Sequence, residues 1–335
     1  QAITSPDSFS RHLCRCCGRF YTQGMPEDTK ALMHEVLSDA EFLTQNQLVI
    51  EERRRLFRQG LSEFEEGLFF FYFSAPDILS HLYWNTIDPN HPGYDAERAE
   101  LFSSAIESAY IEADALVGEA LSRVDERTTL LVISDHGFAP FYRSVNLNGW
   151  LQQQGYLLSH GDSPADFDWS KTRAYGIGFN GLYLNLKGRE AQGIVEDSEK
   201  EELLGALEAE LLNLRDPKTG EKAIGKVYLS ESIYSDANRS LGPDLVVGYN
   251  PGYRASWRTV LGDSQGEIFE DNRSVWSGDH LMAAEAVPGI LLSSRPVQKQ
   301  DCSLLDIAPT VLRLFDLDPP QAMRGGSIFG DGKSP

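Results

Sequence analysis

Residues 128–138 read "TTLLVISDHGF", an apolar and β-branched run that leads directly into Asp135, His136 and Gly137. Such a run predicts a strand that is covered on both faces, as in a parallel sheet. In α/β proteins, ligands bind at the carboxyl ends of strands, which is where Asp135 and His136 stand. Neighbouring residues of a strand point to opposite faces, so both side chains reach one ion only if the chain turns, which Gly137 makes easy. The alternative is that Asp135 caps a loop and His136 is a hydrogen-bonded, partly buried imidazole.

The flanking sequence predicts that this strand belongs to an α/β domain. "GLFFFYF" at 67–73 is a second continuous apolar run, and residues 95–123 repeat apolar side chains every three or four positions, as a long helix does. Strand, helix and strand form a βαβ unit with a right-handed crossover. "VPGILLSS" at 287–294 and "LLDIAPTVLRLFDL" at 304–317 predict a further strand and a closing helix. We expect an α/β fold with a mostly parallel sheet flanked by helices.

The middle of the chain differs from this core. Between residues 141 and 275 the elements are short, glycines are frequent, and a polar helix is expected near 197–214. We predict that 141–275 is a smaller α+β cap inserted in the core. The core itself is assigned to 61–140 and 276–335, and residues 1–60 to an N-terminal helical segment.

The charge balance limits the partners of the protein. Fifty acidic residues against 30 basic ones give a formal charge of −20, which disfavours a nucleic acid polymer or an anionic membrane as a partner. The apolar run at 67–73 is far shorter than the roughly 20 residues that a membrane span needs. A small phosphorylated substrate remains possible if divalent metals supply local positive charge. The sequence leaves the oligomeric state and the cellular compartment open.

Three of the four cysteines, Cys14, Cys16 and Cys17, lie together in "CRCCGRF". This cluster has the chemistry to bind a soft metal, but it lacks a second ligand pair at the spacing of a zinc finger. We expect reduced thiols in a poorly ordered terminus, and a packing role for Cys302.

Two more motifs combine aspartate with histidine. In "APDILSH", Asp77 and His81 are four residues apart, so a helix that starts near Asp77 places both on one face. In "SGDH", His280 precedes an apolar strand, and Asp279 is expected to orient the imidazole or to cap a turn. Each motif alone is weak, since Asp77 would also suit the first turn of a helix. Together with "SDHG" they offer a carboxylate and imidazole mixture that suits zinc, manganese or iron.

The order Asp-x-x-x-His, Asp-His-Gly and Gly-x-His resembles the alkaline phosphatase superfamily, most closely its type I phosphodiesterase and nucleotide pyrophosphatase branch. The tail "DIAPTVLRLFDLDPPQAMRGGSI" also resembles the closing segment of that superfamily, so the resemblance covers roughly residues 67–330. It implies a metal-dependent hydrolase of phosphate esters with two divalent metal ions, which are zinc, manganese or iron. The implied ligands of one ion are Asp77, His81 and His280, and those of the other are Asp135 and His136.

The chain departs from this family pattern upstream of Asp77. The family completes its second ion with an aspartate after the first strand and attacks phosphorus with a Ser or Thr, both of which precede the Asp-x-x-x-His motif. No such strand or turn is found in the first 76 residues. The nominal candidates are Thr4, Ser5, Thr22 and Thr29, and we expect Thr29 to be an ordinary helix-start residue. The expected account is that strand and nucleophile belong to a segment absent from this chain.

Other readings stay open. A phosphomonoesterase, a sulfatase or a phosphonate hydrolase would use the same scaffold, and a full-length chain without a nucleophile would be a non-catalytic metal-binding module. Asn180, Arg143, Arg254 and Arg273 could contact a phosphate, but each is expected to be an ordinary loop or surface residue. The other histidines, His91 among them, are expected to be structural.

Overall fold

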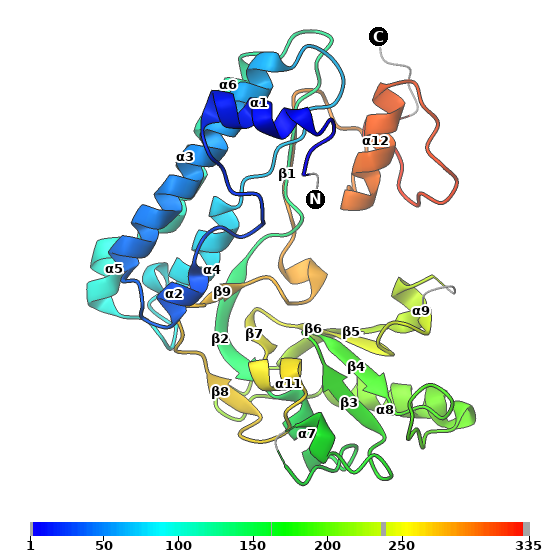
Figure 1. Ribbon diagram of the computed structural model, residues 1–335. Helices are drawn as coiled ribbons and strands as arrows, with labels where there is room; N and C mark the ends of the chain where they lie inside the picture. The colour runs from blue at the N-terminus through cyan, green and yellow to red at the C-terminus, as the bar shows by residue number, and fades with distance from the viewer. Residues whose placement is uncertain (1–2, 162, 236–238, 331–335) are drawn as a thin grey trace. The chain divides into compact units, whose positions relative to one another are not determined.

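The computed structural model describes residues 3–161, 163–235 and 239–330 (Figure 1). The chain divides into two compact units. Unit 1 comprises Gln1–Ala113 and Phe138–Pro288, and unit 2 comprises Asp114–Gly137 and Gly289–Pro335. Helices and several sheets are both present, so the predicted mixed α/β class is confirmed. The predicted cap, residues 141–275, lies within unit 1, and its status as an inserted subdomain stays a prediction.

The first part of the chain is helical. The N-terminal helical segment predicted over residues 1–60 consists of separate helices, and Ser38 starts the last of them. The Ser38 side chain accepts a hydrogen bond from the Glu41 backbone, and the Glu41 carboxylate accepts one from the Ser38 backbone at 2.9 Å. The helix predicted over 95–123 is likewise divided in two. The helices are α1 (Ser8–Cys17), α2 (Thr29–Met33), α3 (Asp39–Glu63), α4 (Ala75–Ile87), α5 (Ala96–Phe102) and α6 (Ala105–Leu121).

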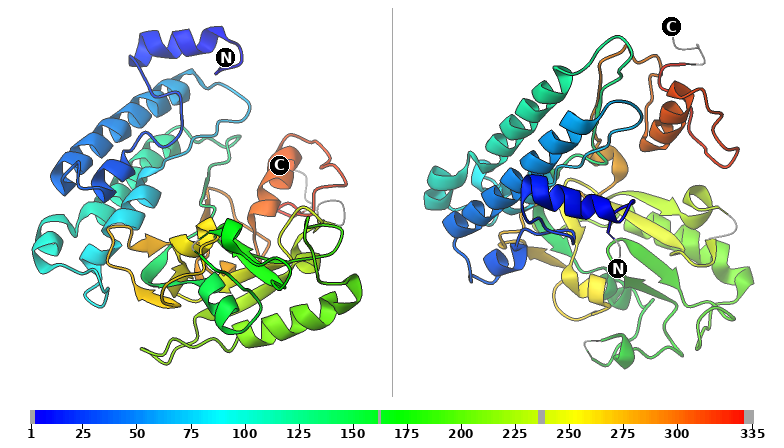
Figure 2. Two further views of the ribbon diagram at one scale, coloured as in Figure 1. Left: turned by 60° about the horizontal axis from the view of Figure 1, so that its bottom comes forward. Right: turned by 45° about the horizontal axis from the view of Figure 1, so that its top comes forward.

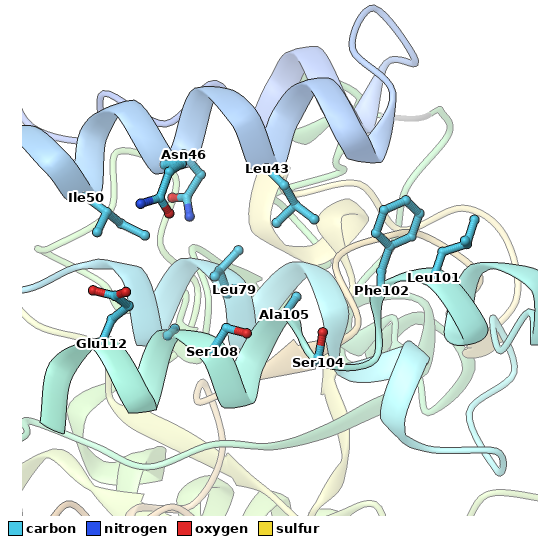
Figure 3. Close-up of a pocket in the computed structure, with 12 residues that line it drawn as sticks. Leu43, Asn46, Ile50, Leu79, Leu101, Phe102, Ser104, Ala105, Ser108 and Glu112 are labelled. Atoms are coloured by element: carbon cyan, nitrogen blue, oxygen red, sulfur yellow. The ribbon is translucent and has the colours of Figure 1, made fainter. Parts of the chain in front are cut away.

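Helices α3, α4, α5 and α6 surround a hollow of about 180 Å³ within unit 1 (Figure 3). Its lining is mostly apolar and includes Leu43, Leu79 and Phe102. Asn46 is only 2% exposed, and its Oδ1 has no hydrogen-bond partner among the described residues. None of the metal ligands expected from the sequence lines this hollow. No helix within the described ranges combines the length and the apolar character needed to cross a membrane.

The segment 67–73 corrects one prediction from the sequence. It belongs to no sheet of the described chain, and its side chains alternate in exposure instead of being covered on both faces. The rings of Phe69, Phe71 and Phe73 pack near Phe57 of α3, with centroids 6.0, 5.5 and 5.4 Å from it. The intervening side chains of residues 68, 70 and 72 are 65%, 72% and 56% exposed. The prediction of a buried strand was therefore wrong: only one face of the segment is covered.

The first sheet of unit 1 is built around β2 (Ala139–Val145). Strand β7 (Gly252–Ala255) pairs with β2 in parallel, whereas β8 (Phe269–Asp271) and β9 (Gly278–Asp279) pair with it antiparallel. Of the strand pairs in the described part of the chain, β2 with β7 is parallel and the others are antiparallel. The structure thus does not bear out the expectation of a mostly parallel sheet.

The second sheet of unit 1 is antiparallel, in the order β3 (Ala174–Ile177), β4 (Gly181–Leu184), β6 (Leu245–Tyr249) and β5 (Ile224–Leu229). Helix α8 (Lys200–Leu211) confirms the polar helix predicted near 197–214. Helix α8 lies beside the strands of this sheet (Figure 2). It buries Leu203, Leu207 and Leu211 in the same apolar cluster as the strands. Unit 1 also contains the described helices α7 (Leu147–Gln153), α9 (Ser230–Ile233) and α11 (Trp257–Leu261).

Unit 2 has a two-stranded sheet and a helix. Strand β1 (Leu131–Ile133) confirms the strand predicted at 128–134, but its partner β10 (Leu291–Ser293) is antiparallel to it. Helix α12 (Ile307–Leu314) confirms the closing helix. Asp306 joins the start of α12 to the tail, since its carboxylate accepts hydrogen bonds from Lys299 Nζ at 2.6 Å and from the Gly326 backbone at 2.9 Å. Burial alone would raise the pKa of Asp306, but these bonds outweigh it and lower the pKa to about 2.

His91 is a structural histidine, as expected. It is 3% exposed, its Nε2 donates to the Phe141 carbonyl at 2.9 Å, and its Nδ1 accepts from the Gly93 backbone at 2.9 Å. Both ring nitrogens are therefore used by the neutral imidazole. Burial lowers the pKa of His91 below its usual value, because the charged form would lose solvent and the bond from Gly93.

We predict that acid destabilises unit 1 partly through His91. A histidine whose pKa is lowered in the fold stabilises it fully above the unfolded value of about 6.5, and this contribution is lost as the pH falls below that value. Urea unfolding of the metal-free protein should give a lower free energy of unfolding at pH 5.0 than at pH 7.5, and this decrease should be larger for the wild type than for His91→Gln. We expect the two decreases to differ by about 1 kcal/mol. Equal decreases would contradict the assignment, and His160→Gln, at an exposed position, serves as the matched control.

Candidate metal centre

Asp77, His81 and His280 lie together in unit 1. Helix α4 begins at Ala75, so Asp77 is in its first turn and His81 lies one turn later on the same face. Asp77 Oδ1 is 3.8 Å from His81 Nε2 and also 3.8 Å from His280 Nε2. The ligand atoms of the three residues all lie within 4.8 Å of one another. The structure thus brings together three residues that are far apart in the sequence.

Gly278 explains how α4 and β9 come close enough to form this group. A Cβ atom at residue 278 would lie only 2.4 Å from the carbonyl oxygen of Ser80 on α4, so a side chain would force the two elements apart. The close approach lets His81 Nδ1 donate a hydrogen bond to the Gly278 carbonyl at 2.8 Å. This is the physical reason for glycine in the Gly-x-His motif.

The hydrogen bond to Gly278 also fixes the tautomer of His81. A carbonyl oxygen only accepts, so the proton is on Nδ1 and the lone pair of Nε2 is available to an ion. The ring is 4% exposed, stacks on Trp276 with centroids 3.8 Å apart, and meets Phe138 edge-on at 4.8 Å. Burial lowers the pKa of His81 to about 4. The imidazole is therefore neutral at pH 7, as a metal ligand must be.

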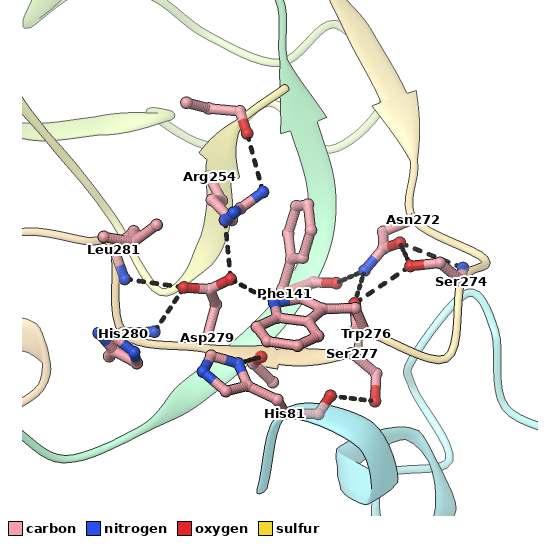
Figure 4. A network of polar contacts seen from close by, with 12 residues as sticks. His81, Phe141, Arg254, Asn272, Ser274, Trp276, Ser277, Asp279, His280 and Leu281 are labelled. Carbon is pink, nitrogen blue, oxygen red and sulfur yellow. Dashed lines mark hydrogen bonds and ion pairs between the residues drawn. The ribbon is translucent and has the colours of Figure 1, made fainter. Parts of the chain in front are cut away.

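Asp279 orients the loop that carries His280 (Figure 4). Its Oδ1 accepts hydrogen bonds from the backbone of His280 at 2.8 Å and of Leu281 at 3.0 Å. Its Oδ2 accepts one from Trp276 Nε1 at 2.8 Å and lies 2.7 Å from Arg254 Nε. Burial alone would raise the pKa of Asp279, but the charge of Arg254 outweighs it, so the pKa is below its usual value. Asp279 thus positions both His280 and the indole on which His81 stacks.

Arg254 is neither a phosphate clamp nor a surface residue. Its side chain is 1% exposed, and its guanidinium lies 4.5 to 5.4 Å from the ring centroids of Phe141, Phe179 and Trp257. Desolvation lowers the pKa of Arg254, while the Asp279 carboxylate opposes this effect. The sequence reasoning missed the Arg254–Asp279 pair. The available signal was only that both residues lie in segments rich in aromatic side chains.

The other residues considered for phosphate contact also have structural partners. Arg143 is buried and forms ion pairs with Asp216 and Asp271. Asn180 Nδ2 donates to the Val247 carbonyl at 2.6 Å and so ties the bend before β4 to β6. Arg273, by contrast, has a side chain that is 74% exposed. Of the three arginines, only Arg273 matches the expectation of a surface residue.

The residue set fits a divalent metal ion. One carboxylate and two imidazoles are typical ligands of zinc, manganese and iron, and a tetrahedral site with bonds of about 2.0–2.2 Å places its ligand atoms roughly 3.3–3.6 Å apart. The separations of 3.8 Å from Asp77 Oδ1 are only slightly longer. The side chains of Asp77 and His280 are 27% and 24% exposed, which leaves a path to solvent on their side.

Asp135 and His136 lie in unit 2, directly after β1. The chain bends at Asp135, and Asp135 Oδ2 lies 3.5 Å from His136 Nε2. His136 Nδ1 donates to the Gly137 carbonyl at 3.0 Å, which leaves Nε2 as the nitrogen with the lone pair. The side chains of the adjacent Asp and His are therefore close to one another, while their sharing of one ion stays a prediction.

The nominal nucleophiles have local roles. Thr29 is 8% exposed and is the first residue of α2, where the Asp28 side chain accepts a hydrogen bond from Ala31 at 3.0 Å. The Thr4 hydroxyl donates to the Pro6 carbonyl at 2.9 Å and accepts from the Ser10 backbone at 3.0 Å. These contacts agree with an ordinary helix start for Thr29 and a turn for Thr4.

Fold and site define a mixed α/β protein with a candidate metal centre made of one carboxylate and two imidazoles. The model of the type I phosphodiesterase / nucleotide pyrophosphatase family matches residues 26–262. The chain therefore belongs to that family, and with it to the alkaline phosphatase superfamily, as its motifs predicted. The matched range includes Asp77, His81, Asp135 and His136, whereas His280 lies beyond it. A search of curated proteins found no match.

Proposed function

We propose that this protein is a metal-dependent phosphodiesterase or nucleotide pyrophosphatase, with Asp77, His81 and His280 as ligands of one divalent ion. Membership of the family implies hydrolysis of phosphoesters, and family members generally use divalent metals such as zinc. The observation that carries the proposal is the convergence of the three ligand atoms within 4.8 Å. When bound, the ion would stabilise negative charge on the oxygens of the phosphoryl group.

The residues of the chain have distinct tasks in this proposal. His81 presents Nε2 because its Nδ1 is held by Gly278, and its burial keeps the ring neutral. Asp77 contributes a negative charge at the mouth of the site. Asp279 and Arg254 hold the His280 loop in place and neutralise one another in the interior. Preorganisation of this kind spares the site a rearrangement when substrate arrives.

We further propose that Asp135 and His136 are ligands of a second ion, as the resemblance implies. Support comes from within unit 2, where Asp135 Oδ2 and His136 Nε2 are 3.5 Å apart at the end of β1. A carboxylate and an imidazole give this ion the same choice of zinc, manganese or iron. We assign no nucleophile among the described residues. The proposed substrate is a small phosphoester, in line with the family.

Substrate profiling tests this proposal. The full-length protein, purified and loaded with zinc, manganese or iron, would be assayed on an aryl phosphodiester, a dinucleotide pyrophosphate, an aryl phosphomonoester and an aryl sulfate. We expect the diester or the pyrophosphate to be cleaved fastest, and Asp77→Asn to abolish this turnover. Preferential cleavage of the monoester or the sulfate would replace the proposal by another reaction on the same scaffold. Metal binding without turnover of any ester, in a chain confirmed as full length, would instead support a non-catalytic metal-binding module.

A further inference from the structure

A second group of metal-binding side chains lies in unit 1, between α1 and α3. His12 and Cys16 are four residues apart on α1, so they share one face of that helix, and Glu63 is the last residue of α3. His12 Nε2 is 2.6 Å from Glu63 Oε1 and 3.8 Å from Cys16 Sγ. The ligand atoms of all three residues lie within 4.8 Å of one another. From this geometry we infer that His12, Cys16 and Glu63 bind one thiophilic divalent metal ion, of the zinc and cobalt class.

The two helices are already fastened to one another beside this group. Arg55 Nε on α3 donates to the Cys17 carbonyl at 3.2 Å, and Cys17 Sγ donates to the Arg55 carbonyl at 3.7 Å. Cys17 is buried, so its thiol packs against α3 and not into the ligand group. The ligands therefore come from two elements whose separation is fixed without the ion, which limits the ordering cost of binding.

The individual ligands are also oriented by their neighbours. The ring of Phe9 stacks on His12 with centroids 5.9 Å apart and an angle of 22° between the planes. Gln59 Nε2, one turn earlier on α3, donates to Glu63 Oε1 at 2.5 Å and so restrains the carboxylate. Such supporting contacts orient the ligands of a metal site and increase its affinity.

The chemistry of the donors selects the metal. Sulfur and imidazole nitrogen favour zinc or cobalt over magnesium or calcium, and Cys16 binds as a thiolate after its proton passes to solvent. The side chains of His12 and Glu63 are 39% and 37% exposed, so an ion can reach them from solvent and keep a water at its fourth position. In a tetrahedral site the ligand atoms are roughly 3.3–3.6 Å apart. The contact of 2.6 Å between His12 and Glu63 would therefore open slightly, while Cys16 would move closer.

Cys14 provides a matched control, because it is on the same helix but not in the ligand group. Two residues from His12 correspond to a rotation of about 200° around the helix, so Cys14 faces away from His12 and Cys16. Its thiol is exposed, as is that of Cys16. If metal bound to any accessible thiol, Cys14 and Cys16 would contribute equally to metal binding. The inferred site requires the thiol of Cys16 and not that of Cys14.

Cobalt titration of the reduced, metal-free protein tests the inference. A bond between cobalt and a thiolate gives a near-ultraviolet charge-transfer absorption, which a group of Asp77, His81 and His280 cannot produce because it contains no sulfur. We expect the absorption in the wild type and in Cys14→Ser, its loss in Cys16→Ser, and at least tenfold weaker cobalt binding in His12→Ala and Glu63→Gln. Cys16→Ser should also bind one cobalt ion fewer than the wild type.

Several outcomes would overturn the inference. These are absence of the absorption at saturating cobalt, its persistence in Cys16→Ser, or its loss in Cys14→Ser. Circular dichroism and thermal unfolding of the metal-free variants establish that each is folded. The absorption is independent of hydrolytic activity, so failure of the proposed function would leave this result intact, and the converse also holds.

Discussion

Arg254→Ala is expected to lower the free energy of unfolding by about 3–5 kcal/mol, because it leaves the Asp279 carboxylate buried without its counter-ion. The side chains of both residues are 1% exposed, and their charged atoms are 2.7 Å apart. Removing one partner of a buried ion pair lowers the free energy of unfolding by more than the lost attraction alone, because the remaining charge stays buried and keeps its desolvation penalty. The substitution also leaves a cavity among Phe141, Phe179 and Trp257, which adds to the loss.

Urea unfolding followed by circular dichroism measures this effect. Arg258→Ala is the matched control, because Arg258 pairs with Asp263 at 3.0 Å but has a side chain that is 44% exposed. An exposed pair of this kind contributes about 0–1 kcal/mol. Arg254→Lys should fall between the two, since it keeps the charge but not the geometry of the guanidinium. If Arg254→Ala and Arg258→Ala have equal effects, the buried pair does not stabilise the protein as proposed.

The helices were the part of the fold that the sequence predicted best, because their signals are local. Apolar periodicity predicted the helix over 95–123, and residues 1–60 were expected to be helical, yet neither expectation included the interruptions that the structure shows. The break before α3 depends on the pairing of Ser38 with Glu41, a capping box that apolar periodicity does not register. A local pattern therefore predicted the kind of element better than its boundaries.

The pairing and direction of the strands could not be predicted from local sequence patterns. "GLFFFYF" at 67–73 has the composition of a doubly covered strand, but composition does not say what lies on each side of it. In the structure α3 covers one face, through Phe57, and no described strand pairs with the segment. The run at 128–134 does form β1, but its antiparallel partner β10 comes from far along the chain. Pairing and direction depend on tertiary contacts that apolar runs do not encode.

The sequence predicted the proposed ligands and the supporting role of Asp279, whose carboxylate accepts hydrogen bonds from the backbone of His280 and Leu281, but it did not predict the partners of Asp279. Asp77 and His81 follow from helical spacing, and aspartate and histidine are recognisable as ligand types wherever they occur. The Arg254–Asp279 pair joins two loops that no periodic pattern connects, and stacking of His81 on Trp276 depends on the same loop closure. Long-range partners such as Arg254 and Trp276 are thus visible only after the chain is folded. Metal binding itself stays a prediction.

His280→Ala is expected to weaken binding of the first ion by more than about 100-fold, because loss of a supporting residue alone costs roughly 10–100-fold and His280 is a proposed ligand. Its Nε2 is 3.8 Å from Asp77 Oδ1, and its backbone is held by Asp279. The remaining Asp77 and His81 would form a two-ligand site from neighbouring turns of one helix. Such a site has no third protein ligand to exclude water or fix geometry.

Calorimetric titration with zinc and manganese measures this loss, in a Cys16→Ser background so that the group at α1 and α3 does not contribute. His160→Ala controls for the removal of an exposed histidine and should leave the affinity unchanged. Asp279→Asn tests the positioning role, because it leaves the proposed ligand His280 in place. The amide retains an oxygen that accepts the hydrogen bond from the backbone of His280, but it removes the charge that faces Arg254. We expect it to weaken binding less than His280→Ala does. An unchanged affinity in His280→Ala would show that His280 is not a ligand, and the convergence of Asp77, His81 and His280 would then be a packing arrangement of α4 and β9.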